Sequence, residues 1–170
     1  SFTHHPKITY NKDEIKIIGV IIMLQQYKHI LVAIDGSYEA ELAFRKAVEV
    51  AKRNNGELFL IHVVDTRAFQ NVSSFDSALV EQVTDTAKKT MEQYVATAKK
   101  NGLDNVNYAI EYGAPKVIIA KEIPKEHNID LIMIGATGLN AVERLLIGSV
   151  TEYVTRTAIC DVLVVRTDLD

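Results

Sequence analysis

The chain has 170 residues, of which 48% are hydrophobic and 24% are charged, and its formal net charge is −3. This length suits a single domain with a substantial core, and the composition excludes a disordered or collagen-like chain. The weak negative charge gives no general attraction to nucleic acid or to an anionic membrane, so any anion site must be local.

The first 22 residues differ from the regular pattern that follows. The apolar run from Ile15 to Leu24 includes Lys16 and is shorter than the roughly 20 residues that a membrane-spanning helix needs. No basic segment precedes this run, as a signal peptide would require. We expect Met23 to be the natural start, with residues 1–22 as an upstream or non-native extension and residues 23–170 as the domain. The alternative is a genuine extra strand or helix that packs on the domain or on a second copy.

The regular pattern begins with an apolar strand and an amphipathic helix. Residues 29–35, HILVAID, form a continuous apolar run that ends in an acid, which is typical of a strand buried on both faces of a sheet. Small and apolar residues then recur three and four positions apart over residues 40–51, which predicts a helix. Ser37 is its expected N-cap, and Asn55-Gly56 is its expected end.

A second strand and a longer helix come next. Residues 57–65, ELFLIHVVD, form another buried apolar run. The segment from Thr66 to Ser74 is an expected mobile loop at the carboxyl end of that strand. An apolar stripe from Leu79 to Ala98 predicts a long helix that begins near residues 73–76 and stops at Asn101-Gly102.

The second half of the chain continues the alternation. Residues 106–113 alternate polar and apolar side chains and predict a strand nearer to a sheet edge. A third helix is expected to begin at Pro115, and Pro124 is expected to kink or end it because proline lacks an N–H. Residues 130–135 predict a buried strand.

The last elements are a helix that begins at Gly148-Ser149 and runs to about Thr157, and an apolar strand over residues 161–166. Strands alternating with helices throughout predict one α/β domain with a parallel sheet and right-handed crossovers. Ligands of such sheets bind at the carboxyl ends of the strands, where the strand order reverses. Asp35, Val63 and Gly135 all fall at strand ends.

Three of the chain's eight glycines, Gly135, Gly138 and Gly148, lie close together in the sequence. Glycine lets the backbone approach a ligand, and the first amides of a helix attract anions. Ser149 and Thr151 add hydroxyl groups at the expected helix start. The spacing matches neither a P-loop nor G-x-G-x-x-G. The residues alone therefore leave two interpretations open, a phosphate cradle or ordinary turns followed by an N-cap.

The arrangement G-x-x-G, nine residues, then G-S resembles the nucleotide motif of the universal stress protein family. HILVAIDGS, LIHVVD, DLIMIGATGLNAVERLLIGSVTEYV and CDVLVVR occur in that family's order, so the resemblance covers residues 27–167. It implies a single-domain open five-stranded parallel sheet in order 3-2-1-4-5 with helices on both faces, a Rossmann-like fold of the adenine nucleotide alpha hydrolase-like class. It also implies an ATP, ADP or AMP ligand, and a homodimer.

The resemblance carries site roles over by position. Asp35 would contact the nucleoside, although it could instead cap the following helix, and Val63 would meet adenine through its backbone. The other expected contacts line the pocket or hold the ribose and phosphates: Ala33, Ile34, Ile134, Gly135, Thr137, Gly138, Gly148, Ser149, Val150 and Thr151. Thr137 stands where many family members have a basic residue or histidine, so a cation facing the phosphates is lost. Arg144 either compensates or is a solvated helix charge.

The remaining reactive residues do not indicate catalysis. His62, inside an apolar strand, is expected to be a buried and hydrogen-bonded histidine. Cys160 is the only cysteine, so an intrachain disulfide is excluded, and we expect an inert thiol in a reducing cytoplasm. No set of His, Cys and carboxylate residues has metal-ligand spacing. Ser149 has no evident base partner, which argues against a Ser-His-Asp hydrolase.

The leading hypothesis is a cytoplasmic, dimeric ATP-binding sensor or regulator of the stress response. Hydrolysis is at most slow, and Mg²⁺ or Mn²⁺ accompanies the phosphates. The strand Asp161–Arg166 would pair with its counterpart in a second copy, which removes an exposed sheet edge. Nucleotide occupancy would bias the loop Thr66–Ser74 and a surface for an unidentified protein partner. The alternatives are a nucleotide-independent interaction module on the same fold, and a nucleotidyl-transferring enzyme, for which no catalytic His or Lys motif is visible.

Overall fold

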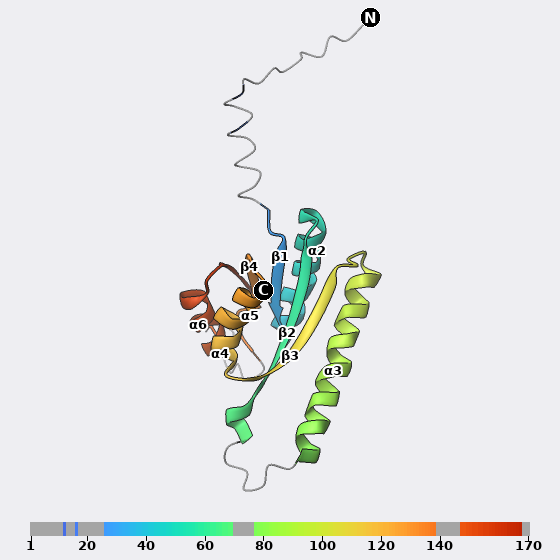
Figure 1. Cartoon of the computed structure of the whole chain (residues 1–170), viewed down its shortest axis with the longest axis vertical. Helices are drawn as coiled ribbons and strands as arrows, with labels where there is room; N and C mark the ends of the chain where they lie inside the picture. Colours follow the sequence, from blue (N-terminus) through green and yellow to red (C-terminus); the bar gives the residue numbers. More distant parts are fainter. Residues whose placement is uncertain (1–11, 13–15, 17–25, 70–76, 139–146, 168–170) are drawn as a thin grey trace, which may run out of the picture.

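Five parallel strands form one sheet with the order β3-β2-β1-β4-β5, which confirms the expected topology. The computed structural model describes residues 12, 16, 26–69, 77–138 and 147–167 (Figure 1). The strands are, in chain order, β1 (His29–Ala33), β2 (Glu57–Asp65), β3 (Val106–Gly113), β4 (Leu131–Gly135) and β5 (Asp161–Val165). The chain turns from β1 toward β2 and β3 on one side and toward β4 and β5 on the other, so the strand order reverses at β1.

Helices cover both faces of the sheet. Helices α2 (Tyr38–Asn54) and α3 (Ser77–Lys100) pack on one face, where they bury the alternate β1 residues Ile30 and Val32. The short segments α4 (Pro115–Val117), η2 (Ile118–Glu122) and α5 (Ile123–Glu126), together with α6 (Ser149–Thr157), bury Leu31 on the other face. The strands are therefore apolar on both sides, which explains their unbroken hydrophobic runs.

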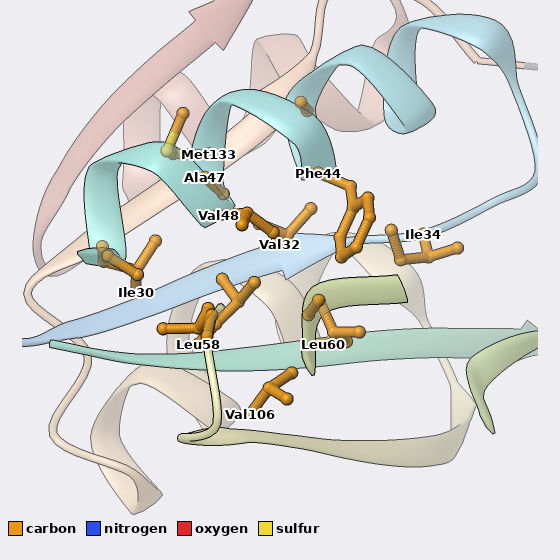
Figure 2. Packing of buried hydrophobic residues seen from close by; sticks show 14 of the residues in the cluster. Ile30, Val32, Ile34, Phe44, Ala47, Val48, Leu58, Leu60, Val106 and Met133 are labelled. Atoms are coloured by element: carbon orange, nitrogen blue, oxygen red, sulfur yellow. The ribbon is translucent and has the colours of Figure 1, made fainter. Parts of the chain in front are cut away.

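The core beneath α2 is centred on Phe44. This side chain is 1% exposed and lies between the helix and the side chains of Val32 in β1 and Ile34 just after it (Figure 2). Its ring meets the ring of Tyr94 from α3 edge-on, with centroids 4.7 Å apart, a favourable geometry for aromatic pairs. The Tyr94 hydroxyl donates to Glu41 at 3.0 Å. Burial, reinforced by this carboxylate, raises the pKa of Tyr94 to about 12.

The segment around Pro124 departs from a simple kinked helix. Residues 118–122 form a π-helical turn, in which the N–H of Ile123 donates to the carbonyl of Ile118, five residues earlier. Pro124 has no N–H with which to continue an α-helical ladder, and the wider turn lies directly before it. The expected perturbation at Pro124 is thus present, but it takes the form of a π turn between two short α-helical pieces.

Some expectations concern parts of the chain outside the described residues. These are the N-terminal extension apart from Lys12 and Lys16, residues 70–74 of the expected loop, and Arg144. The described start of that loop, η1 (Thr66–Phe69), is a 3₁₀ turn. Within the described ranges, no helix has the length and apolar character needed to cross a membrane.

Candidate functional site

A cavity of about 490 Å³ opens at the carboxyl ends of β1 and β4, where the strand order reverses. All twelve residues expected at the site line it: Ala33, Ile34, Asp35, Val63, Ile134, Gly135, Thr137, Gly138, Gly148, Ser149, Val150 and Thr151. The volume is within the range of about 300–1,000 Å³ that is usual for small-molecule sites. Residues far apart in the sequence are thereby brought to one crevice.

The crevice exists because β1 leaves the sheet before its neighbours do. The β1–β2 pairing ends at Ala33 and Ile61, two residues short of the expected strand end at Asp35. Strand β2 continues beside β3 as far as Asp65, and β4 continues beside β5 as far as Gly135. The cavity lies at this level, where β2 and β4 extend past the end of β1.

Asp35 lies at the mouth of this gap and is exposed. Its Oδ1 accepts a hydrogen bond from the N–H of Ser37 at 2.9 Å. The cap of α2 is Ser37 itself, whose Oγ accepts from the N–H of Ala40 at 3.1 Å. Asp35 therefore orders the turn without serving as the cap. Its other oxygen, Oδ2, points toward Gly138, where an added Cβ would lie 2.7 Å from it.

Gly135 has a packing reason to be glycine. An added Cβ would lie 2.8 Å from Cβ of Glu39 and 2.9 Å from its backbone carbon. These atoms belong to the first turn of α2, so the end of β4 and the start of this helix approach backbone to backbone. The expectation that Gly135 serves the ligand is thus joined by a structural role within the fold.

The other two glycines are not required by the protein's own structure. At Gly148, φ is −62°, and an added Cβ would make only ordinary contacts, at 3.5 Å from the Ala136 carbonyl oxygen and the Cα of Thr137. At Gly138, the close atom is Oδ2 at the end of the Asp35 side chain, 2.7 Å from the added Cβ, so a side chain and not the backbone would have to shift. Neither residue has the positive φ that favours glycine. Both border the cavity, where a Cβ would take space from a ligand.

The start of α6 offers free backbone donors to the cavity. Gly148 is the N-cap and provides no capping side chain. Its carbonyl accepts from Glu152 at 2.8 Å, so the amides of the three residues between them lie in the first turn, where helix N–H groups have no intrahelical partner. The Thr151 hydroxyl donates to the Gly135 carbonyl at 2.7 Å and is buried. This hydrogen bond holds the end of β4 against α6, so the Thr151 hydroxyl cannot donate the same proton to a ligand.

The opposite end of the cavity carries an ion pair. Asp65 lines the cavity, and Arg67 donates to its two oxygens from Nε at 2.8 Å and from Nη2 at 2.6 Å. This hydrogen bonding holds the pKa of the Asp65 carboxyl below its ordinary value. The pair is exposed at the surface, where such bridges add little stability. It fixes the charge and orientation of Asp65 beside the cavity.

The described residues offer few groups for chemistry. Among residues 26–69, 77–138 and 147–167, no group of three or more His, Cys, Asp or Glu side chains could hold a metal ion. Burial, with smaller contributions from Asp130 and Asp161, raises the pKa of the Cys160 thiol to about 11. Cys160 is therefore protonated at neutral pH and a poor nucleophile. A bound nucleotide would depend on backbone amides, hydroxyls and Asp35.

Six further residues, which were not expected at the site from the sequence, also line the cavity: Ser37, Ala40, Ile61, Asp65, Pro115 and Ile119. The last two come from the opposite face of the sheet, from α4 and the π turn. Nothing in the local sequence pattern distinguishes them from ordinary core residues. The carboxyl-end rule could have indicated Asp65, because it ends β2 next to the strand where the order reverses.

Three comparisons place the chain among known proteins. A sequence model described as the universal stress protein family matches residues 26–166. A Staphylococcus haemolyticus protein that carries the universal stress protein name is 46% identical over 142 residues, which cover 84% of this chain and 86% of that protein. The universal stress protein UspA from Lactobacillus plantarum superposes with a TM-score of 0.69 at 34% identity, over 83% of this chain and 99% of that chain. A universal stress protein in complex with cAMP has a TM-score of 0.66 at 24% identity, over 85% of this chain and 100% of that chain, and this similarity concerns the fold.

Proposed function

The chain belongs to the universal stress protein family, and on that premise we propose that it binds ATP or a related adenine nucleotide in the crevice between β2 and β4. The observation that carries this proposal is the pair Gly138 and Gly148. Both lack a conformational or packing reason to be glycine, and both border the cavity at the start of α6. A phosphate approaching the free amides of that helix would need the space that a side chain would fill.

The rest of the cavity suits a nucleoside. Ala33, Pro115 and Ile119 give apolar surface for a base, and Val63 offers its backbone at the edge of β2. Asp35, with one oxygen turned toward Gly138, is placed to accept hydrogen bonds from ribose hydroxyls. A fold relative that binds cAMP lends support, since its ligand is an adenine nucleotide.

We assign a regulatory role, with at most slow hydrolysis. The described cavity lining contains no His or Lys, and its carboxylates are Asp35 and Asp65, of which the second is engaged by Arg67. Asp35 is the carboxylate beside Gly138, and we assign it to the ribose hydroxyls, so the described lining offers no His or Lys as a general base at the phosphate end. With Thr137 at that end, the described lining residues include no side-chain cation, so Mg²⁺ or Mn²⁺ held by the phosphates would supply balancing charge.

The proposal includes a homodimer formed through residues 161–166. Strand β5 is an edge of the sheet, and Leu163 on it is 40% exposed. The carbonyl of Val165 accepts from Ala136 at 2.7 Å, inside the sheet. Because backbone groups alternate in direction along a strand, the N–H of Val164 faces the free edge. Pairing of this edge with a second copy would satisfy such groups.

Nucleotide occupancy would then bias η1 (Thr66–Phe69), the described start of the segment after β2, and with it a surface for an unidentified protein partner in the cytoplasm. The loss of a cation at Thr137 keeps the nucleotide-independent interaction module as the second candidate. One experiment separates the two: mass spectrometry of ligand released from freshly purified protein, with calorimetric titration of ATP. Copurified adenine nucleotide or saturable binding supports the proposal. If no ligand is released and no heat of binding is measured, the proposal is refuted in favour of the interaction module.

A further inference from the structure

The imidazole of His62 is hydrogen-bonded to the backbone carbonyl of Ile34, which the next bond of the β1–β2 ladder would otherwise use. The last backbone bond of this ladder runs from the N–H of Ile34 to the carbonyl of Ile61, at 2.8 Å. In a regular parallel pair, the next bond would join the N–H of Val63 to the carbonyl of Ile34. That carbonyl instead lies 2.8 Å from Nδ1 of His62. A carbonyl only accepts, so Nδ1 carries the proton.

The consequence falls on Val63. Backbone groups alternate in direction along a strand, so the N–H and carbonyl of Val63 point to the same side as the Ile61 carbonyl, toward β1. Strand β1 no longer pairs at that level, while β2 remains paired with β3 as far as Asp65. Val63 lines the cavity and is half-buried. Its donor and acceptor therefore face the crevice.

We propose that His62 is a positioning residue for base recognition. By holding the Ile34 carbonyl, it keeps the Val63 N–H out of the sheet and available to the edge of a purine. Adenine presents a ring-nitrogen acceptor beside an amino donor, which complements one backbone N–H and one carbonyl. On this Watson–Crick edge guanine presents a ring N–H donor beside a carbonyl acceptor, the reverse of adenine, so the same pair disfavours it. The inference rests on the proposed function for its ligand, but its backbone part can be measured without one.

The backbone part is tested by amide hydrogen exchange, followed by NMR on the nucleotide-free full chain. In the unmodified protein the Val63 amide should exchange at least about tenfold faster than the Ile34 amide, which is inside the ladder. In His62→Leu the Ile34 carbonyl loses its donor, and an unpaired buried carbonyl is costly. The ladder should then extend, so exchange at Val63 should slow by about tenfold or more. In His62→Asn the side-chain amide can replace Nδ1, and exchange should stay fast.

The ligand part compares calorimetric affinities for ATP and GTP. His62→Leu should reduce the ratio of ATP to GTP affinity by about tenfold, the value of one hydrogen bond. His62→Asn should keep the ratio of the unmodified protein. If His62 has only a structural role, His62→Leu should lower the affinities for ATP and GTP equally and leave their ratio unchanged. That result would overturn the proposal.

Two further outcomes keep the two proposals distinct. If the unmodified protein binds neither nucleotide, the proposed function fails, and the exchange data still decide whether His62 keeps Val63 out of the ladder. If His62→Leu does not fold, the unmodified protein and His62→Asn decide. A Val63 amide as protected as that of Ile34 in the nucleotide-free protein, or loss of the ATP preference in a folded His62→Asn variant, overturns the inference.

Discussion

Replacing Gly148 with alanine separates the two explanations for a glycine at the start of α6. The new methyl group would lie 3.5 Å from the Ala136 carbonyl oxygen and the Cα of Thr137, and 3.6 Å from the nitrogen of Gly138. These are ordinary contacts, and φ of −62° suits alanine. If the glycine is only a turn residue, the substitution has no reason to affect a ligand.

The stability change follows from two opposing effects. Alanine is a poorer N-cap than glycine, at a cost of roughly 0.5–1 kcal/mol. It also lowers the entropy of the unfolded chain, which stabilises the native state by about 0.4–1 kcal/mol. We expect the free energy of unfolding to change by less than about 1 kcal/mol, and Tm by less than about 4 °C.

The effect on binding should be much larger. Charge-assisted hydrogen bonds from backbone amides to phosphate contribute about 1.5–3 kcal/mol each. A methyl group that prevents one such contact should weaken the affinity for ATP about 10- to 100-fold. Isothermal titration calorimetry measures the affinity, and thermal unfolding without ligand measures the stability.

Gly102→Ala is the matched control. Gly102 has φ of +84° with open space around it, and it is not among the residues that line the cavity. Alanine there should cost about 1–2 kcal/mol of stability and leave ATP affinity unchanged. Equal ATP affinity in Gly148→Ala and the unmodified protein would refute the phosphate cradle.

Two substitutions and one alkylation experiment test separate parts of the structure. Gly135→Ala places a methyl group 2.8 Å from the Glu39 side chain and should lower the urea-derived stability by about 1–3 kcal/mol; a neutral result would contradict the close packing of β4 on α2. Val164→Pro removes a donor from the free edge of β5, so size-exclusion chromatography with light scattering should find a monomer with unchanged circular dichroism, and a persistent dimer would exclude this interface. The Cys160 pKa is raised to about 11 from an ordinary 9.0, so the native state holds the proton more tightly; the resulting stabilisation is present below pH 9 and is lost as pH rises toward 11. Iodoacetamide at pH 8 should accordingly alkylate native protein far more slowly than urea-unfolded protein, and equal rates would show that the thiol is not protected by burial.

The parallel strands could be predicted from local signals, whereas the strand order and the full set of lining residues followed from the resemblance to the family. Runs such as residues 57–65 are apolar throughout since helices cover both faces of the sheet, and this pattern identifies parallel strands. The same patterns placed Asp35 and Val63 at strand ends and Gly148 at a helix start, and the resemblance assigned these residues to the ligand. Parallel strands end on the same side, so these residues meet in one crevice.

The other features depend on contacts between distant segments. The hydrogen bond from His62 to the Ile34 carbonyl requires β1 and β2 to be in register, and no local pattern encodes it. Ile119 reaches the cavity from a π turn, whereas Pro124 alone predicts only that a helix is disturbed. The packing role of Gly135 is equally invisible in the sequence, because the atoms it meets lie almost a hundred residues earlier.

The contact between Gly135 and the first turn of α2 also separates the residues of α2 that can be substituted from those that set its distance to the sheet. Helix α2 meets the sheet here through its own backbone, so side chains on its outer face, such as Arg45 and Lys52, take no part in setting the spacing. That outer face can change its charge over evolutionary time while Asp35 keeps its place opposite the glycine turn. Substitutions on that outer face should therefore leave the spacing between α2 and β4, and with it the crevice, unchanged.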